Sequence, residues 1–301
     1  MRILFCRNPL EPTKPDEPYE GEAAAANALG IPWSLIDFEA LVNDRDAERA
    51  VRRVRDVEPG LCLYRGWMLR PEAYARLFDV LARRGLRLLN DPAAYRHAHY
   101  LPESYAEIAP VTPRSVWIPS GAEPPMPEIR ERLREFGKRP LVLKDYVKSQ
   151  KHAWAEACFI PDASDTTAVE RVVRRFLELQ GPELNEGLVF REFVELERIG
   201  THPRSGLPLF REHRVFFLDR EPVFTCRYWD EAAYGEGAAP VDRFREVARR
   251  VRSRFFSMDI ARKTNGEWIV VELGDGQVAG LPDNADRSIF LEAIKRRWPA
   301  V

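Results

Sequence analysis

Two acidic side chains near the C-terminus are spaced so that a β-hairpin would bring them together. An Asn-Gly pair at residues 265–266 lies between two apolar runs, and Asn-Gly is the typical two-residue hairpin turn because both central residues need a positive φ. Pairing Thr264 with Glu267 and counting outward places Asp259 opposite Glu272. Directly opposed like charges destabilise a sheet. A magnesium ion held by these carboxylates together with phosphate groups would remove the repulsion.

Asp275 adds a third acidic side chain to this candidate site. It follows Glu272 by three residues in a Gly-Asp-Gly turn, whose glycines let the backbone bend the carboxylate back toward the same ion. Asp259, Glu272 and Asp275 are therefore predicted to converge as magnesium ligands. For the hairpin alone, an exposed edge with hydrated charges is the alternative, because acidic side chains are mostly exposed in proteins.

A second pair of like charges occurs in the segment 213–228. If Arg220-Glu221 forms a two-residue turn, Arg214 faces Arg227 across the hairpin. Two opposed guanidinium groups repel each other unless an anion lies between them, and arginine is suited to binding phosphate. We therefore predict phosphate contacts for both arginines. A register slip of one residue would place them on opposite faces, as ordinary surface side chains.

Basic residues follow another apolar run. Lys144 ends this run, and a polar segment that contains Lys148, Ser149 and Lys151 comes next. The segment is either a solvated loop or a flap that places amines over phosphates. Together with the opposed carboxylates and arginines, these residues describe a metal–polyphosphate site.

The composition argues against several classes of protein. The chain has 301 residues, a formal net charge of −1 and 31% charged residues, unlike a general nucleic-acid or membrane-surface binder. No stretch approaches the roughly 20 apolar residues of a membrane span, and residues 1–6 have the pattern of a strand rather than of a signal peptide. The four cysteines lie far apart, so we expect buried free thiols and a reducing, cytoplasmic environment.

The order of predicted elements indicates an α/β protein with several lobes. Residues 1–90 alternate strands and helices, which is typical of a parallel sheet with crossover helices. A loop over residues 8–18 is expected at the carboxyl end of the first strand, where open α/β sheets bind ligands. Residues 91–186 and 187–301 are expected to form two further lobes of α+β character. Among the predicted strands are 2–7, 33–37, 61–64, 86–90, 141–144, 154–160, 187–194, 213–219 and 222–229, and among the helices 20–29, 47–57, 71–84, 127–136, 167–179, 242–255 and 286–298.

These pieces, in this order, resemble the ATP-grasp superfamily, and in particular its small stand-alone bacterial and phage members. In that family a lysine ends a strand of the first ATP-binding lobe, as Lys144 does. A later strand lines the adenine with backbone groups, and an acidic residue on it holds the ribose. The residues that resemble this nucleotide-lining strand are Glu192, Phe193, Val194 and Glu195.

Two further motifs carry the resemblance. Glu212-His-Arg214 is similar to the family's acidic-x-Arg strand, whose arginine meets the terminal phosphates. Asp259 and Glu272 resemble the magnesium motif, an Asp on one strand and Glu-x-Asn on the next. Two departures stand beside these matches. Gly274 replaces the asparagine, with Asp275 as the candidate substitute, and the family's glycine-rich flap is replaced by the basic segment 148–152.

The resemblance implies a Rossmann-like pre-ATP-grasp domain over residues 1–90 and a two-lobed ATP-grasp fold over 91–301. It implies ATP and magnesium as cofactors and ligation of a carboxylate to an amine through an acylphosphate. The substrate would be a small molecule or a peptide, and Arg65, which follows a strand, is the candidate binder of its carboxylate, with a structural surface arginine as the alternative. Two other functions stay open: a kinase-type phosphotransferase, and a nucleotide-binding regulatory protein without turnover.

Overall fold

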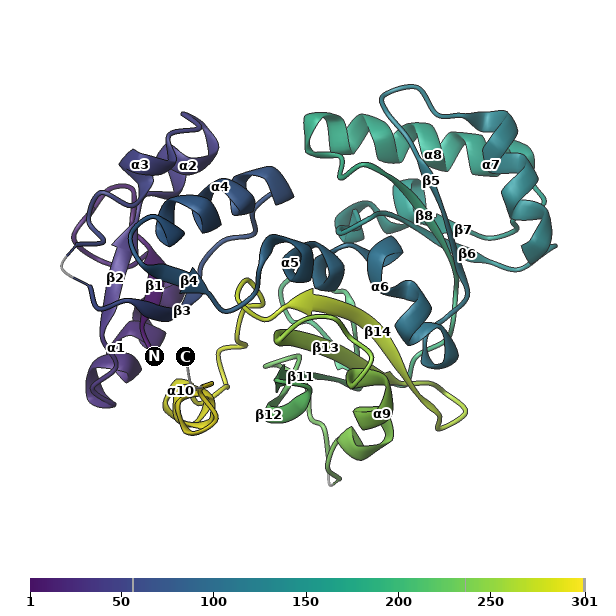
Figure 1. Cartoon of the computed structure of the whole chain (residues 1–301). Helices are drawn as coiled ribbons and strands as arrows, with labels where there is room; N and C mark the ends of the chain where they lie inside the picture. Colours follow the sequence, from purple (N-terminus) through teal and green to yellow (C-terminus); the bar gives the residue numbers. More distant parts are fainter. Residues whose placement is uncertain (56, 236, 300–301) are drawn as a thin grey trace. The chain divides into compact units, whose positions relative to one another are not determined.

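The computed structural model describes residues 1–55, 57–235 and 237–299, which form two compact units (Figure 1). Unit 1 contains Met1–His99, Arg198–Ile260 and Glu272–Val301, and unit 2 contains Tyr100–Glu197 and Ala261–Val271. The chain therefore crosses between the units more than once. The domain boundaries predicted at residues 90 and 186 stay predictions. No helix among the described residues is long and apolar enough to cross a membrane.

Unit 1 begins with a parallel four-stranded sheet in the order β2-β1-β3-β4. Its strands are β1 (Ile3–Cys6), β2 (Trp33–Ile36), β3 (Gly60–Arg65) and β4 (Leu86–Leu88). The helices that connect or follow them are α1 (Glu20–Ala28), α2 (Phe38–Val42), α3 (Ala47–Ala50), α4 (Pro71–Ala82) and α5 (Pro92–His99). The predicted α/β class is confirmed, although the helix expected over 47–57 is a single turn.

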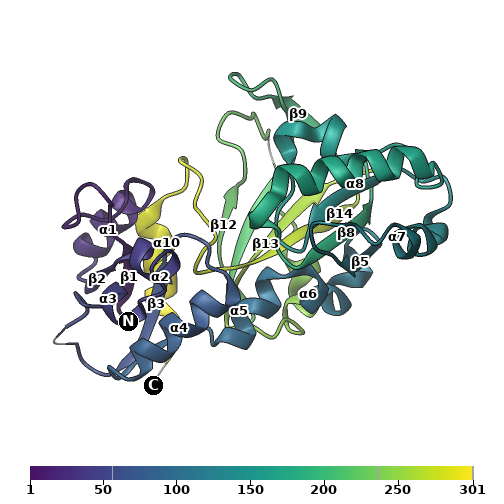
Figure 2. The ribbon, with the colours of Figure 1, turned by 90° about the horizontal axis from the view of Figure 1, so that it is seen from above.

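Side chains alternate between the two faces of this sheet, so β1 contributes to two separate cores. Leu4 and Cys6 pack among the apolar side chains of α2, α3 and α4. Ile3 and Phe5 pack on the other face with α1 and with the C-terminal helix α10 (Arg287–Arg296). Helix α10 lies beside α1 (Figure 2). The last helix of the chain thus completes the core of its first sheet.

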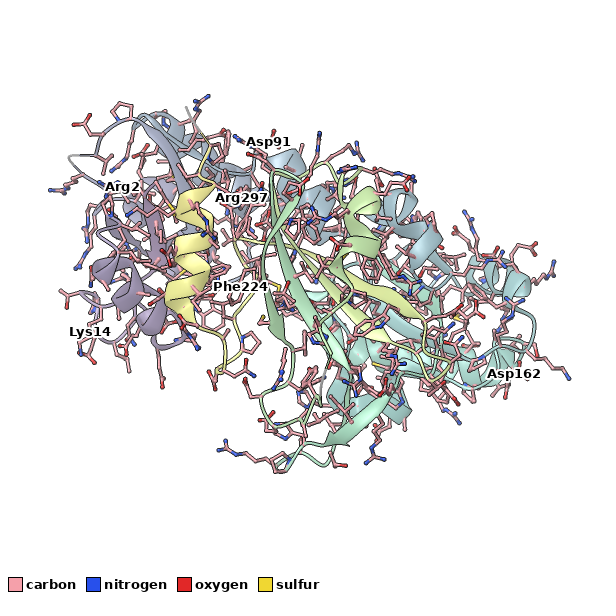
Figure 3. The ribbon with its side chains drawn as sticks, turned by 90° about the horizontal axis from the view of Figure 1, so that it is seen from below. Arg2, Lys14, Asp91, Asp162, Phe224 and Arg297 are labelled. Carbon is pink, nitrogen blue, oxygen red and sulfur yellow. The ribbon has the colours of Figure 1, made fainter. Side chains whose placement is uncertain are left out.

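A second sheet in unit 1 has the order β12-β11-β13-β14. Its strands are β11 (Glu212–Leu218), β12 (Glu221–Arg227), β13 (Phe255–Arg262) and β14 (Trp268–Asp275). Phe224 of β12 packs edge-on against Phe290 of α10, with ring centroids 5.4 Å apart (Figure 3). The tip of the β13–β14 hairpin, Ala261–Val271, belongs to unit 2. A small pair of strands, β9 (Arg198–Thr201) and β10 (Pro208–Phe210), and the short helix α9 (Arg245–Ala248) complete this part.

Unit 2 is built on an antiparallel sheet in the order β5-β8-β6-β7. Its strands are β5 (Ser115–Pro119), β6 (Leu141–Asp145), β7 (Phe159–Ile160) and β8 (Gly187–Glu192), and its helices are α6 (Leu101–Ile108), α7 (Met126–Leu133) and α8 (Thr166–Gln180). Helices α7 and α8 lie on one side of the sheet and share its core (Figure 1). Asp165 caps α8 by accepting hydrogen bonds from the N–H groups of Thr167 and Ala168.

One predicted strand of unit 2 is wrong. Residues 154–160 were expected to be extended, but Lys151–Ala153 forms a 3₁₀ turn and Trp154–Cys158 a π-helical turn, which leaves only Phe159–Ile160 in the sheet. Four of the five residues in Trp154–Cys158 carry small or helix-compatible side chains, and α8 packs against this turn. Tertiary packing therefore overrides the apolar pattern that suggested a strand.

Candidate functional site

The β13–β14 hairpin is present, but its turn differs from the predicted one. Gly266, at a φ of 88°, donates its N–H to Lys263 O (2.9 Å), and Lys263 donates its N–H to Glu267 O (2.7 Å). Lys263 rather than Thr264 therefore pairs with Glu267. This is a three-residue loop in which Gly266 supplies the left-handed conformation, and Asn265 has no positive φ.

The pairing of this hairpin shifts by one residue between its two ends. At the open end Gly276 donates its N–H to Phe255 O (3.0 Å), which is the register that a two-residue turn would give. The alternation of buried residues along β14 also shifts by one residue in this interval. Val270 is buried with half-buried neighbours on both sides, whereas beyond it the buried residues are Leu273 and Asp275. Glu272 lies within this interval, so its direct opposition to Asp259 stays a prediction. Of the five residues expected on the packed face, Met258, Ile260 and Leu273 are buried, while Ile269 and Val271 are half-buried.

Asp259 and Arg214 form a two-pronged ion pair between neighbouring strands. The Nε and Nη2 atoms of Arg214 donate to the two carboxylate oxygens of Asp259 at 2.8 and 2.7 Å. A third donor, Nη1, bonds to Gly280 O at 2.9 Å, and the guanidinium lies 5.0 Å from the ring centre of Tyr228. Burial alone would lower the pKa of Arg214, but the Asp259 carboxylate raises it above its ordinary value. The sequence thus identified two residues that meet, although it predicted different neighbours for each.

The predicted opposition of Arg214 and Arg227 is wrong. The turn is Asp219-Arg220, both with positive φ, and the register shifts between Phe216 and Phe217. Arg214 consequently pairs with Cys226, and Arg227 with His213. Because successive strand residues point to opposite faces, the two arginines lie on opposite faces of the sheet.

On its own face, Arg227 is exposed and lies 5.4 Å from the ring centre of Tyr234. Burial, with Arg211 and Arg227 nearby, lowers the pKa of His213 to about 4. This face therefore brings Arg211 and Arg227 close to His213. The phosphate role predicted for Arg227 loses the geometry on which it rested.

Asp275 has a structural role and is not placed to bind a ligand. Its side chain is completely buried, and it accepts hydrogen bonds from Asn90 Nδ2 (2.5 Å) and from the N–H (2.9 Å) and Nε2 (3.3 Å) of Gln277. Burial raises the pKa of Asp275 to about 7. Among residues 1–55, 57–235 and 237–299, no three His, Cys, Asp or Glu side chains form a group that could hold a metal ion. The predicted convergence of three carboxylates is therefore wrong. Asp275 does not join the other two because its oxygens already accept hydrogen bonds from Asn90 and Gln277.

Arg65 is also structural. Its side chain has no exposed surface, and its Nε and Nη2 atoms donate to the two oxygens of the buried Glu22, each at 2.7 Å. Its Nη1 atom donates to Gly276 O (2.7 Å) and Ala279 O (2.9 Å). A substrate carboxylate cannot reach this guanidinium, which contradicts the predicted binding role. Arg65 instead fixes the segment whose last residue, Gly280, accepts from Arg214.

In unit 2, Lys144 lies on β6 directly across from Val189 of β8 and is buried, with 8% of its surface exposed. The residue after it, Asp145, was not singled out by the sequence analysis. Its carboxylate accepts from the main-chain N–H groups of Val147 (2.6 Å) and Lys148 (2.5 Å). The only signal in the sequence is its place, immediately after a strand-end lysine and before the basic segment.

The four residues predicted to line a nucleotide follow the end of β8. Glu192 is the last strand residue, and Phe193 donates its N–H to Pro140 O at 2.9 Å. Glu195 O accepts from the N–H of Thr264 at 3.1 Å. In the part of the chain that the structure describes, neither the N–H nor the C=O of Val194 has a hydrogen-bond partner. Backbone groups of this kind are what adenine recognition requires.

An aromatic cluster lies beside this segment, and the sequence analysis missed it. Phe193 packs edge-on against Phe159 (5.2 Å between ring centroids) and lies 6.3 Å from Trp154. Trp154 stacks on Phe159 at 5.9 Å and keeps 37% of its surface exposed. The cluster provides an apolar surface next to the free main-chain groups of Val194. The π-helical turn that carries Trp154 had been predicted as a strand, which hid this relation.

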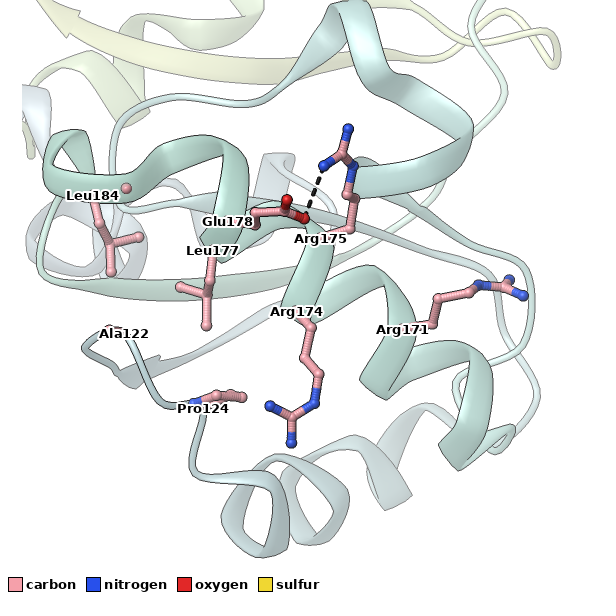
Figure 4. A pocket seen from close by; sticks show the side chains of 9 residues that line it. Ala122, Pro124, Arg171, Arg174, Arg175, Leu177, Glu178 and Leu184 are labelled. Atoms are coloured by element: carbon pink, nitrogen blue, oxygen red, sulfur yellow. Dashed lines mark hydrogen bonds and ion pairs between the residues drawn. The ribbon is translucent and has the colours of Figure 1, made fainter.

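Two hollows among the described residues lie away from these residues. One, of about 660 Å³, runs along α8 and is lined by Arg171, Arg174, Arg175 and Glu178, of which Arg175 and Glu178 form an ion pair (Figure 4). The other, also about 660 Å³, is in unit 1 between the ends of β4 and the Asp219-Arg220 turn. Neither contains a predicted site residue, so neither serves as the nucleotide site proposed below.

Comparisons with known proteins assign the family. A family model described as ATP-grasp domain, R2K clade family 3, matches residues 135–295. The fold is similar to that of the D-cycloserine synthetase DcsG, at 14% identity over 99% of both chains with a TM-score of 0.56. It is similar to a RimK domain ATP-grasp protein from Sphaerobacter thermophilus, at 13% identity over 98% of this chain and 100% of that one with a TM-score of 0.57.

A third solved structure is the ATP-grasp ligase PsnB complexed with a phosphomimetic variant of its minimal precursor, Mg and ADP. It shares 16% identity over 98% of both chains, with a TM-score of 0.57. No curated protein matches the sequence. The family model spans more than half of this chain, and the solved structures share its fold from end to end. The chain belongs to the ATP-grasp family, R2K clade family 3.

Proposed function

We propose that this protein is an ATP-dependent ligase that joins a carboxylate to an amine. The observation that carries the proposal is the Arg214–Asp259 pair, with N–O distances of 2.8 and 2.7 Å, on neighbouring strands of an ATP-grasp chain. It brings together a planar phosphate-binding group and a carboxylate of the type that holds a metal ion. Arg214 is thus prepared to contact the terminal phosphates of ATP, because its fork geometry matches phosphate as well as carboxylate.

Several groups of unit 2 are proposed to hold the nucleotide. Lys144 and the segment with Lys148, Ser149 and Lys151 are proposed to bind its phosphates. The free backbone of Val194, with the rings of Phe193 and Trp154 nearby, is proposed to line the adenine, and Glu192 to hold the ribose. Glu192 lies 3.8 Å from the guanidinium of Arg139, so its carboxylate is available to a hydroxyl without a short ion pair in the way. Glu195 is exposed and contributes its backbone to the same segment.

The donor set fits magnesium in one binding mode. Magnesium usually takes one or two protein carboxylates and completes its shell with phosphates and water. Asp259 and Glu272, on β13 and β14, are the proposed ligands, and Asp275 is not, because it is buried in bonds to Asn90 and Gln277. Bound there with the nucleotide, the ion would neutralise charge on the phosphate oxygens. Arg214 would then divide its donors between Asp259 and the phosphate.

The proposed reaction needs positioning and charge stabilisation more than covalent help from the protein. An oxygen of the substrate carboxylate attacks the γ-phosphorus, the bond to the β,γ-bridging oxygen breaks, and ADP leaves. The amine then attacks the acylphosphate carbonyl, loses a proton and expels inorganic phosphate, which leaves an amide. Arg214 stabilises the negative charge that develops on the transferred phosphoryl group, and the lysines hold the phosphates in line.

The substrate is proposed to be a small molecule or a peptide that carries the carboxylate, with an amine as acceptor. The solved relatives named above include a synthetase of D-cycloserine and a ligase complexed with a variant of its minimal precursor. Another structural neighbour is a D-alanyl-alanine synthetase from Vibrio cholerae. The four cysteines are free and buried, which suits the cytoplasm as the proposed compartment.

The test measures products while the acceptor is varied. Protein, ATP and magnesium are incubated with a panel of carboxylates, with and without a panel of amines, and ADP and inorganic phosphate are assayed separately. A ligase releases both products in equal amounts only when carboxylate and amine are present. ADP release without inorganic phosphate identifies a phosphotransferase. Binding of ATP without any turnover across the panels identifies a regulatory nucleotide-binding protein and contradicts the proposal.

A further inference from the structure

Asp145 is a fully buried carboxylate at the point where the strand with Lys144 gives way to the basic segment. One of its oxygens accepts from the N–H groups of Val147 (2.6 Å) and Lys148 (2.5 Å). The other accepts from Gln180 Nε2 (2.6 Å) and from Asn185 Nδ2 (2.8 Å) and N–H (3.1 Å). Five donors therefore converge on one side chain.

The charge of Asp145 is balanced by these neutral donors. Within the described residues, no Lys, Arg or His nitrogen forms an ion pair with its carboxylate. A buried charge without an opposite charge is costly unless hydrogen bonds satisfy it, and bonds to an ionised acceptor contribute more than neutral ones. With five donors bound to it, the Asp145 carboxylate holds the surrounding chain in a defined shape.

The shape that it holds is the start of the basic segment. Asp145 donates its own N–H to Lys148 O (2.8 Å) while its side chain receives the N–H of Lys148, so the turn 145–148 is closed from both sides. Gln180, at the end of α8, also bonds to Gln150, which ties the next part of the segment to the same network. The segment is thus fixed by side chains and has no need of a flexible glycine hinge.

This arrangement also determines which groups can cover a phosphate. Glycine-rich loops bind phosphates with main-chain N–H groups that point at the oxygens. Here the N–H groups of Val147 and Lys148 point at Asp145 instead and are already used. The polar side chains of this segment include those of Lys148 and Lys151, which are exposed, and that of Ser149, which is half-buried.

We infer that Asp145 is a positioning residue that fixes segment 146–151, so that its basic side chains are placed to cover the phosphates of the nucleotide. The inference rests on the proposed function, because it takes ATP as the ligand. It adds a residue that touches no substrate but sets the geometry of those that do, and it accounts for the replacement of a glycine-rich flap by a basic one.

The first test changes Asp145→Asn, which keeps the volume and replaces one acceptor oxygen by a donor. Asp162→Asn is the matched control, because Asp162 also holds a turn of unit 2, through Ser164 N–H (2.8 Å) and Oγ (2.6 Å), at the place labelled in Figure 3. In the free protein, amide exchange at Val147 and Lys148 is expected to accelerate in Asp145→Asn and to stay unchanged in Asp162→Asn. Unchanged exchange in Asp145→Asn would overturn the inference whether or not ATP binds.

The second test measures ATP binding by calorimetry. Asp145→Asn is expected to weaken the affinity about tenfold, since a tenfold change corresponds to the loss of roughly one such hydrogen bond, and Asp162→Asn to leave it within about twofold. A two-site cycle with Lys148→Met separates positioning from general damage: Lys148→Met should cost much less affinity in the Asp145→Asn background than in the wild type. Equal costs in both backgrounds would overturn the inference. Failure of the wild type to bind ATP would contradict the proposed function. The amide-exchange test would still show whether Asp145 fixes the turn 145–148.

Discussion

Two arginines on apolar strands show how the same local pattern leads to different roles at the scale of single residues. Arg65 and Arg214 both interrupt apolar strands, and both form two-pronged bonds to a carboxylate. Arg65 is completely buried against Glu22, whereas Arg214 keeps an exposed edge with a relative side-chain exposure of 18%. The identity of the partner depends on which helix or strand packs nearby. A sequence pattern around the arginine itself contains no such information.

Replacing Arg65 by methionine is expected to destabilise the protein by about 3–5 kcal/mol, because it leaves the charge of Glu22 buried without a partner. Urea unfolding measures the change. The double variant Glu22→Gln/Arg65→Met should recover part of the loss, since the unpaired charge is removed as well. A normal unfolding midpoint combined with a raised KM for the carboxylate substrate would restore the binding role that the burial of Arg65 contradicts.

Replacing Arg214 by lysine is expected to lower turnover about 30-fold to 1000-fold, equivalent to roughly 2–4 kcal/mol of transition-state stabilisation, while ADP binding changes little. Lysine keeps the charge but loses the fork, and ADP lacks the phosphate that the fork would contact. Arg227→Lys is the matched control, because Arg227 lies on the other face of the same two strands. Equal effects of the two substitutions would show that the Arg214 face has no special role.

The stability of the protein is expected to fall as the pH rises from about 4 to 7, through Asp275. Burial raises the pKa of Asp275 to about 7 in the folded state, above the value of about 4 in an unfolded chain. The folded state therefore binds more protons in this range, and each unit of difference corresponds to about 1.4 kcal/mol. The difference in unfolding free energy between Asp275→Asn and the wild type, measured in urea from pH 4.5 to 8, should grow with pH. Parallel curves would contradict the raised pKa.

At the scale of elements, the sequence predicted both hairpins but neither turn. Asn265-Gly266 suggested a two-residue turn, and the chain forms a three-residue loop that uses only Gly266 in a left-handed conformation. The other turn places Asp219 and Arg220 at positive φ, although arginine has no preference for it. The register shift inside β11–β12 then placed Arg227 on the opposite face from Arg214. Such shifts arise from packing on the two faces of a sheet, which residue alternation alone does not reveal.

The close contact between β5 and β8 gives a prediction at this scale. Gly187 of β8 has no room for a side chain, because a Cβ atom would lie 2.4 Å from Ile118 O and 2.8 Å from the Tyr146 ring. Gly187→Ala is therefore expected to destabilise unit 2 by about 1–3 kcal/mol through strand displacement. Gly121→Ala, where a Cβ meets no atom within 4 Å, is the control. Equal shifts of the unfolding temperature in both variants would show that β5 and β8 accommodate the added methyl group without loss of stability.

At the scale of the whole molecule, part of the architecture could be predicted from the sequence, while the domain boundaries at residues 90 and 186 stay predictions. The parallel first sheet is as predicted, but unit 1 gathers segments from both ends of the chain. Helix α10 packs into the core of the first sheet, and Arg65 bonds to Gly276 and Ala279. Contacts between residues about 200 positions apart follow from tertiary packing. Local periodicity does not encode them.

A fragment of residues 1–90 is consequently expected to lack a stable fold. It contains all four strands of the first sheet but loses α10, whose Phe290 and Ile294 belong to the same core as Ile3 and Phe5. Circular dichroism with thermal melting measures the outcome, and adding a separate peptide of residues 280–299 should restore part of the structure. A cooperative transition of the fragment alone would mean that the N-terminal domain predicted from sequence is independent.

The tip of the β13–β14 hairpin has a consequence for the synthesis of the protein. Arg191 of β8 is buried and donates to the carbonyl oxygens of Val271 (2.5 Å) and Val270 (3.1 Å), which follow it by about 80 residues. At about 5–20 residues per second on the ribosome, unit 2 waits roughly 4–16 s between the appearance of this guanidinium and of its acceptors. During that time the nascent chain carries an unfinished sheet in which Arg191 lacks two of its acceptors, while Thr112, another acceptor, is already synthesised. Chaperones that bind nascent chains would meet this protein chiefly in the interval between β8 and β14.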